Sequence, residues 1–201
     1  VTGVGYTPRG ELRLPRGLTL DGRSLRLLLQ GGVLCNDAEL VQEGDQFSIK
    51  GDPTEAALLV AAEKAGIGSS ATRAQHRRIG EIPFSSERKR MTTLHLMDDE
   101  GVVAFMKGAP ETVINRCKHI VEGDTVRELN DQERAHILEQ NTAMAGDALR
   151  VLALAYREFG DHPSRYEDVL ESEMVFLGLM GMMDPPRDEA RQAVETCKQV
   201  G

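Results

Sequence analysis

Three short β-strand-forming runs, joined by tight turns, place the strongest constraint on how this chain can fold. They span residues 78–83, 91–97 and 102–107, and the last two are separated only by the sequence DDEG at residues 98–101. A turn of that length joins antiparallel neighbours, whereas parallel strands need a crossover of about a dozen or more residues. We therefore expect an antiparallel meander here rather than a βαβ unit.

Two apolar runs predict further strands. Residues 148–156 (ALRVLALAY) and 174–183 (MVFLGLMGMM) have the pattern of strands that are buried on both faces. Together with the helical periodicity seen elsewhere, they predict an α+β fold, in which a mainly antiparallel twisted β-sheet is flanked by helices. We also predict helices at residues 24–35 (weakened in its second half by the Gly31-Gly32 pair), 72–77, 110–117, 131–145 and 188–200, hairpins at residues 39–50 and 120–128, and strand-like residues 1–6.

The clearest helix start in the chain precedes residues 56–65. Asp52 is a residue type that favours the N-cap, and Pro53 suits the first helical position. Glu55 stands three residues after the cap, which is the spacing of a capping box. We therefore predict a helix that begins here and stops at Gly66, with the Glu55 carboxylate bonded back to the cap.

Composition disfavours several classes of function. The formal net charge of -8 opposes non-specific binding to nucleic acid or to an anionic membrane, so an anionic ligand needs a local basic cluster. The three cysteines are far apart and form no Cys-x-x-Cys motif, which indicates a reducing cytosolic setting without a disulfide framework or a zinc site. The most apolar run, residues 175–183, is far shorter than the about 20 residues that span a bilayer. Residues 1–6 also have no charged segment ahead of an apolar one, so we expect no signal peptide, and the sequence does not begin with Met.

The stretch from Ile82 to Glu111 combines an aromatic ring, a basic turn and a strand-end lysine, which together suit a nucleotide. Phe84 could stack on a base, which is worth about 1–3 kcal/mol, although phenylalanine is more often a core residue. Lys107, followed by Gly108, could meet a phosphate or could extend its ammonium group into solvent. The Arg88-Lys89-Arg90 turn could attract an anion or could be a solvated turn.

Two residues outside this stretch are further candidates. Arg150 shares a strand face with Leu152 and Leu154, so its guanidinium group needs either a phosphate or a structural salt bridge. Glu55, if it does not serve the capping box, could accept the exocyclic amine of adenine. The chain contains no P-loop, no Gly-x-Gly-x-x-Gly after a strand and no His-Glu-x-x-His, so a P-loop nucleotidase, a Rossmann dehydrogenase, a kinase and a metalloenzyme are disfavoured.

Five motifs, taken together and in this order, resemble the nucleotide-binding domain of P-type cation-transporting ATPases. The resemblance extends over nearly the whole chain and is nearest to the calcium-pump-like branch, including its bacterial and cyanobacterial members. The motifs are GDPTEAAL (residues 51–58), PFSSERKRM (83–91), KGAPE (107–111), LRVLALA (149–155) and DPPR (184–187).

The resemblance implies a domain that binds ATP and delivers its terminal phosphate to an aspartate on a neighbouring domain. It implies that Phe84 stacks on adenine, that Glu55 contacts the adenine edge, and that Lys107 lines the pocket floor beside Gly108. The other residues that the motifs assign to the pocket are Lys89 and Arg150 toward the phosphates, together with Met91 and Leu152.

The resemblance also implies partners outside this sequence. The Asp-Lys-Thr-Gly-Thr sequence that carries the phosphorylated aspartate is missing, as is the later Thr-Gly-Asp motif. We therefore expect an excised cytosolic domain of an integral membrane pump, which works with the phosphorylation and actuator domains of the same full-length chain. Residues 1–183 would be the nucleotide-binding domain and residues 184–201 a return segment toward the phosphorylation domain.

The expected ligand is ATP, with Mg²⁺ accompanying it in the full-length pump. The isolated domain is expected to be monomeric and to bind ATP without turning it over. Where the calcium-pump pattern often has a basic residue this chain has Ser86, so one phosphate contact is either missing or supplied by Arg88.

Two other functions remain open on these residues. One is a regulatory or docking module that keeps the fold but binds no nucleotide. The other is a stand-alone phosphotransferase, which would need an acceptor or a base beside the phosphates, and no motif offers one.

Overall fold

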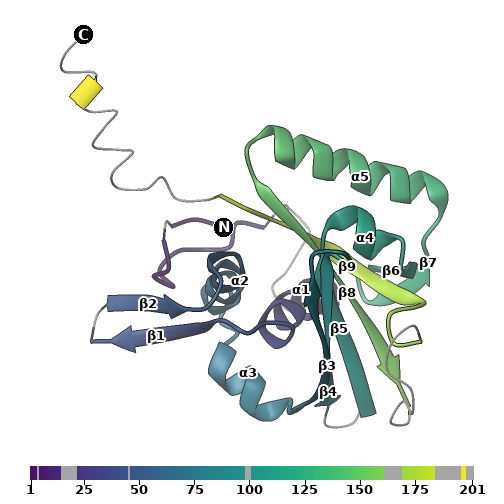
Figure 1. The fold of residues 1–201 in the computed structure, drawn as a ribbon, viewed down its shortest axis with the longest axis horizontal. Coiled ribbons are helices and arrows are strands. Elements are labelled where there is room, and N and C mark those ends of the chain that lie inside the picture. The colour runs from purple at the N-terminus through teal and green to yellow at the C-terminus, as the bar shows by residue number, and fades with distance from the viewer. Residues whose placement is uncertain are drawn as a thin grey trace.

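A seven-stranded β-sheet forms the centre of the fold (Figure 1). The computed structural model describes residues 1–3, 5–14, 22–44, 46–97, 101–160, 169–183 and 196–197. All neighbouring strands of the sheet are antiparallel except β6 and β9, which are parallel, so the predicted α+β class is confirmed. In order across the sheet, the strands are β3 (Arg78–Ser85), β4 (Arg90–Met97), β5 (Gly101–Gly108), β8 (Arg150–Phe159), β9 (Met174–Met182), β6 (Cys117–Glu122) and β7 (Thr125–Glu128).

The strands predicted from the two apolar runs lie in the middle of this sheet, next to the meander. The meander β3-β4-β5 has the predicted connectivity, and β8 pairs with β5 on one side and β9 on the other. The central residues of β8, from Ala153 to Tyr156, are all buried. Burial on both faces explains why this segment is a continuous apolar run rather than an alternating one.

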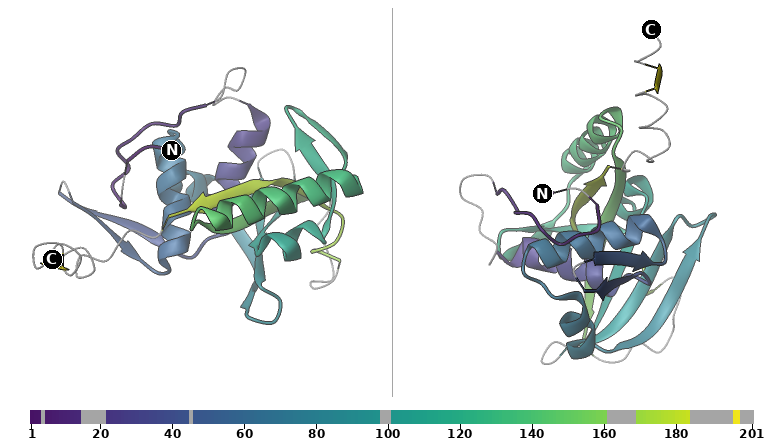
Figure 2. Two further views of the ribbon diagram at one scale, coloured as in Figure 1. Left: turned by 90° about the horizontal axis from the view of Figure 1, so that it is seen from above. Right: turned by 90° about the vertical axis from the view of Figure 1, so that its left-hand side faces the viewer.

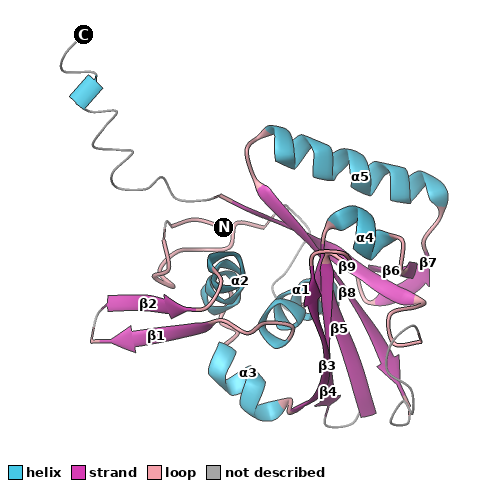
Figure 3. Ribbon diagram, viewed as in Figure 1, coloured by secondary structure: helices cyan, strands magenta, loops and turns pink. Residues whose placement is uncertain are grey.

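Helices cover both faces of the sheet (Figure 3). On one face, side chains such as Phe105 and Leu154 form a core cluster with α1, while on the other face Met106 and Ala153 form a cluster with α4. The longest helix, α5, packs against β8 on the α4 side. The helices are α1 (Arg23–Leu34), α2 (Pro53–Lys64), α3 (Ser69–Gln75), α4 (Pro110–Ile114) and α5 (Asp131–Gly146).

The glycine pair that weakened the prediction of the first helix has a packing role. Helix α1 continues through Gly31 and Gly32, and both residues are buried. A Cβ atom at Gly31 would lie 2.9 Å from Cδ1 of Phe105 on β5. The pair therefore lets the helix approach the sheet closely, at a cost in helix propensity.

A second, separate sheet consists of the hairpin β1 (Glu39–Glu43) and β2 (Gln46–Lys50). Figures 1 and 2 show the hairpin to one side of the molecule, beyond α2 and away from the large sheet. Its inward side chains Leu40 and Ile49 pack against the cluster formed by α1 and α2. The predicted hairpin at residues 39–50 is confirmed, as is the one at residues 120–128, which corresponds to β6 and β7.

Some predicted boundaries are wrong. Residues 1–3, 5 and 6 form no strand, because Thr2 bonds to Glu11 in the same loop and its carbonyl oxygen accepts a hydrogen bond from Nζ of Lys64 (2.8 Å) rather than from a neighbouring strand. The helix predicted at residues 110–117 ends at Ile114, since Cys117 already pairs with Met174 in the large sheet. The helix predicted at residues 188–200 lies outside the described residues, apart from residues 196 and 197. None of the described helices is long and apolar enough to cross a membrane.

Candidate functional site

The N-terminus of α2 supplies the first part of the candidate site. The Asp52 side chain caps the helix by accepting hydrogen bonds from the backbone N–H groups of Thr54 (2.8 Å) and Glu55 (3.3 Å). Burial by itself would raise the pKa of the Asp52 carboxyl group, but these hydrogen bonds and the Thr54 side chain outweigh it, so the pKa is lowered. The predicted N-cap is confirmed.

The predicted capping box is wrong, because the Glu55 carboxylate turns away from the cap. Its Oε2 accepts a hydrogen bond from the backbone N–H of Asp37 (3.0 Å), and its Oε1 accepts one from Nζ of Lys107 (2.5 Å). Lys107 ends β5 and its side chain is only 7% exposed, so its ammonium group requires a counter-charge. The need to neutralise the buried ammonium group of Lys107 outweighs the local preference of Glu55 for capping its own helix.

Lys107 therefore does not extend into solvent as a strand-end lysine often does. Its cross-strand neighbours are Met91 on β4 and Leu154 on β8. Directly opposed residues on antiparallel strands point to the same face, so these three side chains form one row across the sheet. Met91 and Leu154 are buried, which makes the row an apolar floor with a single paired cation.

Gly108 stands where two backbone segments meet. A Cβ atom at this position would lie 2.4 Å from the carbonyl oxygen of Lys89. That carbonyl accepts a hydrogen bond from the N–H of Ala109 (2.9 Å), and Lys89 itself has a φ of 51° in the turn between β3 and β4. Glycine is thus required at position 108, because the carbonyl oxygen of Lys89 occupies the space of a side chain. The same contact holds the backbone of Lys89 in a strained, left-handed conformation.

The basic turn is largely neutralised by a residue that the sequence did not single out. The buried carboxylate of Glu171 accepts hydrogen bonds from Arg88 (2.7 Å), from Nε of Arg90 (2.8 Å) and from the Thr92 hydroxyl (2.8 Å). Arg90 is almost fully buried and Arg88 is partly buried, whereas the side chain of Lys89 is exposed. Of the three cations, Lys89 is therefore the one that the turn presents to solvent, and the Arg88 guanidinium predicted to compensate for Ser86 is already paired.

Arg150 and Leu152 lie at the start of β8, on the strand face of Leu154. Nη1 of Arg150 donates a hydrogen bond to the Thr54 hydroxyl (2.7 Å), which ties β8 to the first turn of α2. Arg150 is exposed and Leu152 is half-buried. Thr54 was not predicted, although its place beside Glu55 in the first turn of α2 was the available signal.

Phe84 is 61% exposed, so the interpretation as a core phenylalanine is wrong. The β3–β4 register shifts between Ile82 and Ser85, and a bulge of this kind re-aims side chains. Ser85 pairs with Arg90, and neighbouring residues on a strand point to opposite faces. Phe84 therefore belongs to the face that carries Met91 and Lys107.

The predicted residues come from four parts of the chain and meet at one end of the sheet. Direct hydrogen bonds join Glu55 to Lys107 and Thr54 to Arg150, and strand register adds Met91 and Leu152. An exposed ring beside an apolar floor suits a flat heterocycle, and the exposed cations Lys89 and Arg150 suit an anion. Within the described part of the chain, no group of three or more His, Cys, Asp or Glu side chains could hold a metal ion.

Comparisons with known proteins show the family of this chain. A family model described as the P-type ATPase cytoplasmic domain N matches residues 24–189. Among curated relatives, the cation-transporting ATPase pma1 of Synechocystis is 38% identical over 209 residues, covering all of this chain and 23% of the relative. Calcium-transporting ATPase 1 of Bacillus cereus is 40% identical over 176 residues, covering 88% of this chain and 19% of the relative. The calcium-transporting ATPase of Bacillus subtilis is 34% identical over 205 residues, covering all of this chain and 23% of the relative. The chain thus spans less than a quarter of the length of these relatives.

Proposed function

This chain belongs to the P-type ATPase family, as its cytoplasmic domain N, and on that premise we propose that it binds ATP and presents the terminal phosphate to an aspartate on a separate domain of a cation-transporting pump. The observation that carries the proposal is the exposed ring of Phe84 on the sheet face where Met91 and Lys107 form a buried floor. The fold leaves this ring in solvent beside an apolar floor. A base can therefore stack on it without breaking any existing packing of the ring.

The residues at the adenine end fit the base. Adenine stacks on Phe84, and Gly108 lets the backbone of Lys89 approach the end of β5 beside this ring. The Glu55 carboxylate accepts one hydrogen bond on each oxygen, from Lys107 and from the Asp37 N–H. A carboxylate oxygen has two lone pairs, so Glu55 retains the capacity to accept the exocyclic amine of adenine.

The residues at the phosphate end are fewer than the basic turn alone would indicate. Arg88 and Arg90 are held by Glu171, so attraction for the phosphates comes from Lys89 and Arg150. Arg150 offers a planar set of donors that matches phosphate oxygens, and its bond to Thr54 fixes its position relative to the α2 N-terminus. Mg²⁺ would arrive bound to the phosphates and would neutralise part of their charge.

The chemistry of transfer lies outside these 201 residues. This chain would hold the base and orient the phosphates, while the accepting aspartate belongs to the phosphorylation domain and the actuator domain acts on the product of that transfer. On this proposal residues 1–183 form the nucleotide-binding domain, residues 184–201 return toward the phosphorylation domain, and the whole is a cytosolic part of an ion-translocating membrane protein. The names of the relatives, which are calcium- and cation-transporting ATPases, support the assignment of the parent protein.

A nucleotide titration of the 201-residue chain tests the proposal. We expect backbone amide NMR signals of Phe84 and Gly108 to shift saturably with ATP. Phe84→Ala should weaken binding by about 5- to 150-fold, as expected from the loss of about 1–3 kcal/mol of stacking, and Lys107→Ala should weaken it as well. Val126→Ala, which truncates another exposed apolar side chain on the far edge strand β7, is the matched control and should bind like the wild type.

Equal affinity of the wild type, Phe84→Ala and Lys107→Ala would refute the site. A complete lack of shifts with ATP would instead favour the alternative, a docking module that has kept the fold without the nucleotide.

A further inference from the structure

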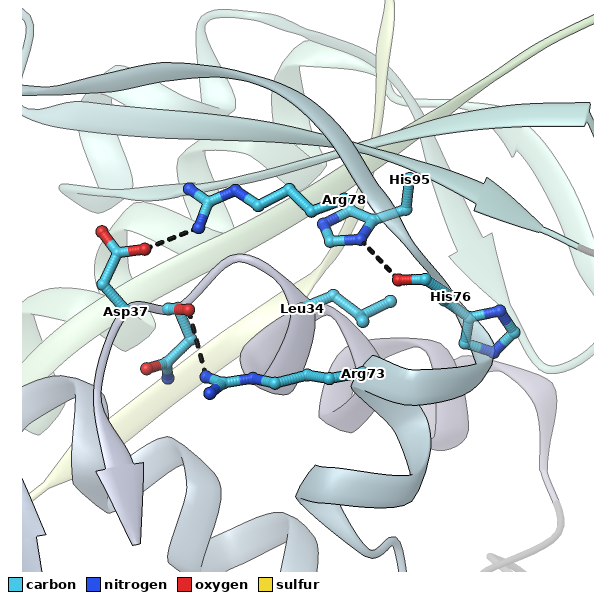
Figure 4. A pocket seen from close by; sticks show the side chains of 7 residues that line it. Leu34, Asp37, Arg73, His76, Arg78 and His95 are labelled. Atoms are coloured by element: carbon cyan, nitrogen blue, oxygen red, sulfur yellow. Dashed lines mark hydrogen bonds and ion pairs between the residues drawn. The ribbon is translucent and has the colours of Figure 1, made fainter.

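A polar cavity lies on the same side of the sheet as α1, and none of the residues assigned to ATP lines it (Figure 4). It has a volume of about 240 Å³ and lies where the end of α1, α3, the start of β3 and the end of β4 meet. His95, which lines it, is four residues from Met91 along β4, or about 13 Å at 3.3 Å per residue. The cavity is therefore distinct from the proposed nucleotide site but adjoins it, since Asp37 in its lining bonds through its backbone N–H to Glu55.

Two guanidinium groups face each other across this cavity. Figure 4 shows Arg73 and Arg78 on opposite sides, with Leu34 between them. Arg73 is anchored by three backbone carbonyls, those of Val33 (3.3 Å), Asn36 (3.0 Å) and Ala38 (3.0 Å). Burial lowers the pKa of Arg73, but an arginine keeps its charge at neutral pH.

The lining contains one carboxylate, that of Asp37, which accepts a hydrogen bond from Nη1 of Arg78 (2.6 Å), and Nη2 of Arg78 forms a second ion pair with Glu81 (2.7 Å). The Asp37 side chain is 61% exposed, so an exposed ion pair of this kind is weak and easily exchanged. The backbone of Asp37 is fixed separately by Glu55, so that only the side chain has to move if another anion replaces it.

Two buried nitrogen atoms at the cavity have no hydrogen-bond partner among the described residues, namely Nδ1 of His76 and Nε of Arg78. His76 is only 6% exposed, and unsatisfied polar atoms at such depth are rare in folded proteins. The other imidazole, His95, is already bonded on both nitrogens, to the His76 carbonyl (3.1 Å) and to the Thr93 hydroxyl (2.9 Å). The cavity thus combines two fixed cations with two unused polar atoms.

We propose that this cavity is a binding site for a small oxyanion of the size of inorganic phosphate. The anion would lie between Arg73 and Arg78, take the place of the Asp37 carboxylate at Arg78, and hydrogen-bond to His76. Arg73 and Arg78 carry two positive charges, and both carboxylates paired with Arg78 are more than half exposed. An oxyanion that replaces one of them therefore gains charge-assisted hydrogen bonds that a neutral ligand would lack. The site does not depend on ATP binding by this chain.

A titration with inorganic phosphate, at constant ionic strength maintained with chloride, tests the proposal. We expect saturable shifts in the amide NMR signals of Asp37, His76 and Arg78 of the 201-residue protein, with a dissociation constant on the order of millimolar. Arg78→Gln should weaken binding at least tenfold. Arg26→Gln, which removes one charge from an exposed position of α1, is the matched control and should leave the affinity unchanged.

A variant that binds phosphate more tightly provides a second test, because a general loss of structure would only weaken binding. Asp37→Asn removes one of the two carboxylates that compete for Arg78, the one that lines the cavity, so phosphate should bind several-fold more tightly to this variant. Three results would overturn the site: no saturation at Asp37, His76 and Arg78; shifts that saturate only at Lys89 and Gly108, where the nucleotide is proposed to bind; or an Asp37→Asn variant that binds phosphate no better than the wild type.

Discussion

At the scale of single residues, Glu55 shows how one carboxylate can satisfy a buried partner at the expense of its own helix. Its capping role is left to Asp52, while its two oxygens serve Lys107 and the Asp37 backbone. The pair it forms with Lys107 is largely shielded from water, with side-chain exposures of 16% and 7%. Pairs of this kind are costly to break, because the remaining charge is left without a partner.

The first prediction concerns this pair. Glu55→Gln should lower the free energy of unfolding by about 2–3 kcal/mol, because it leaves the Lys107 ammonium group buried and unpaired. The double variant Glu55→Gln/Lys107→Met should lose less, since no charge then remains buried. Urea denaturation measures both, and Lys118→Met, which breaks the exposed pair with Glu173, is the control with a much smaller loss. A double variant that is less stable than Glu55→Gln would contradict the argument.

The second prediction concerns His95. Its Nδ1–H donates to the His76 carbonyl and its Nε2 accepts from the Thr93 hydroxyl, which defines a neutral imidazole in a buried position. Burial lowers the pKa of His95 from 6.5 to about 4. Between these values the unfolded chain binds the proton and the folded chain does not, so stability should fall as the pH decreases from about 6.5 toward 4, by up to about 3 kcal/mol.

Urea denaturation at a series of pH values measures this effect. His95→Gln should flatten the decrease between pH 6.5 and 4, whereas His136→Gln, at an exposed position of α5, should not. Carboxyl groups with lowered pKa values, such as Asp52, act at lower pH, because their unfolded pKa is near 4. An unchanged slope in His95→Gln would contradict the assignment of this loss to His95.

At the scale of elements, the turn between β3 and β4 is held from outside by Glu171. This residue precedes β9 in the chain and pairs with Arg88 and Arg90, which flank Lys89. The close contact between Gly108 and the Lys89 carbonyl holds the other side of the turn. The position of Lys89, and with it the proposed phosphate end of the site, therefore depends on three separate segments.

The third prediction follows from this arrangement. Glu171→Gln should destabilise the protein by about 3 kcal/mol, because Arg90 is buried and loses its counter-charge. It should also speed hydrogen exchange at the amide of Lys89, whose N–H bonds to the Ser85 carbonyl at 2.7 Å. Glu173→Gln, two residues away at an exposed position, is the matched control. Unchanged exchange at Lys89 would mean that Glu171 does not hold the turn.

At the scale of the whole molecule, the proposed function divides binding from chemistry. The chain contains residues suited to a base and to phosphates, but it has no Asp-Lys-Thr-Gly-Thr sequence to accept a phosphoryl group. The fourth prediction is that the 201-residue protein binds ATP without Mg²⁺-dependent phosphate release or self-phosphorylation. Radiolabelled ATP measures both on a sample whose binding has been verified by titration, and Mg²⁺-dependent release above the protein-free rate would contradict the prediction.

Local signals in the sequence predicted most of the elements. Asp52 is an N-cap as predicted, and Asn130, directly before the helix predicted at residues 131–145, forms a full capping box with Glu133. The strands of the meander and the two apolar runs are at the predicted places. These features depend on residues within a few positions of one another, so they can be inferred from the chain alone.

Contacts between distant residues could not be inferred in the same way. Glu55 has the spacing of a capping box, but its partner Lys107 is 52 residues away, and Glu171 is 79 to 83 residues from the groups it binds. Residues 110–117 have helical character, yet the chain enters the sheet at Cys117 because β9 is there to pair with it. In each case a buried charge or an unpaired strand edge imposed a requirement stronger than the local preference.

For this protein, the sequence by itself determined the elements, the order of the motifs and the family they indicate. Only the tertiary structure decided which charges are already paired, since that depends on strand register and on which side chains the fold removes from water. It left Phe84 exposed and paired Lys107 with Glu55. It also paired Arg88 and Arg90 with Glu171, so these two cations are not available to a phosphate. It also brought Arg73 and Arg78 to opposite sides of one cavity, because α3 and β3 pack there against the end of α1.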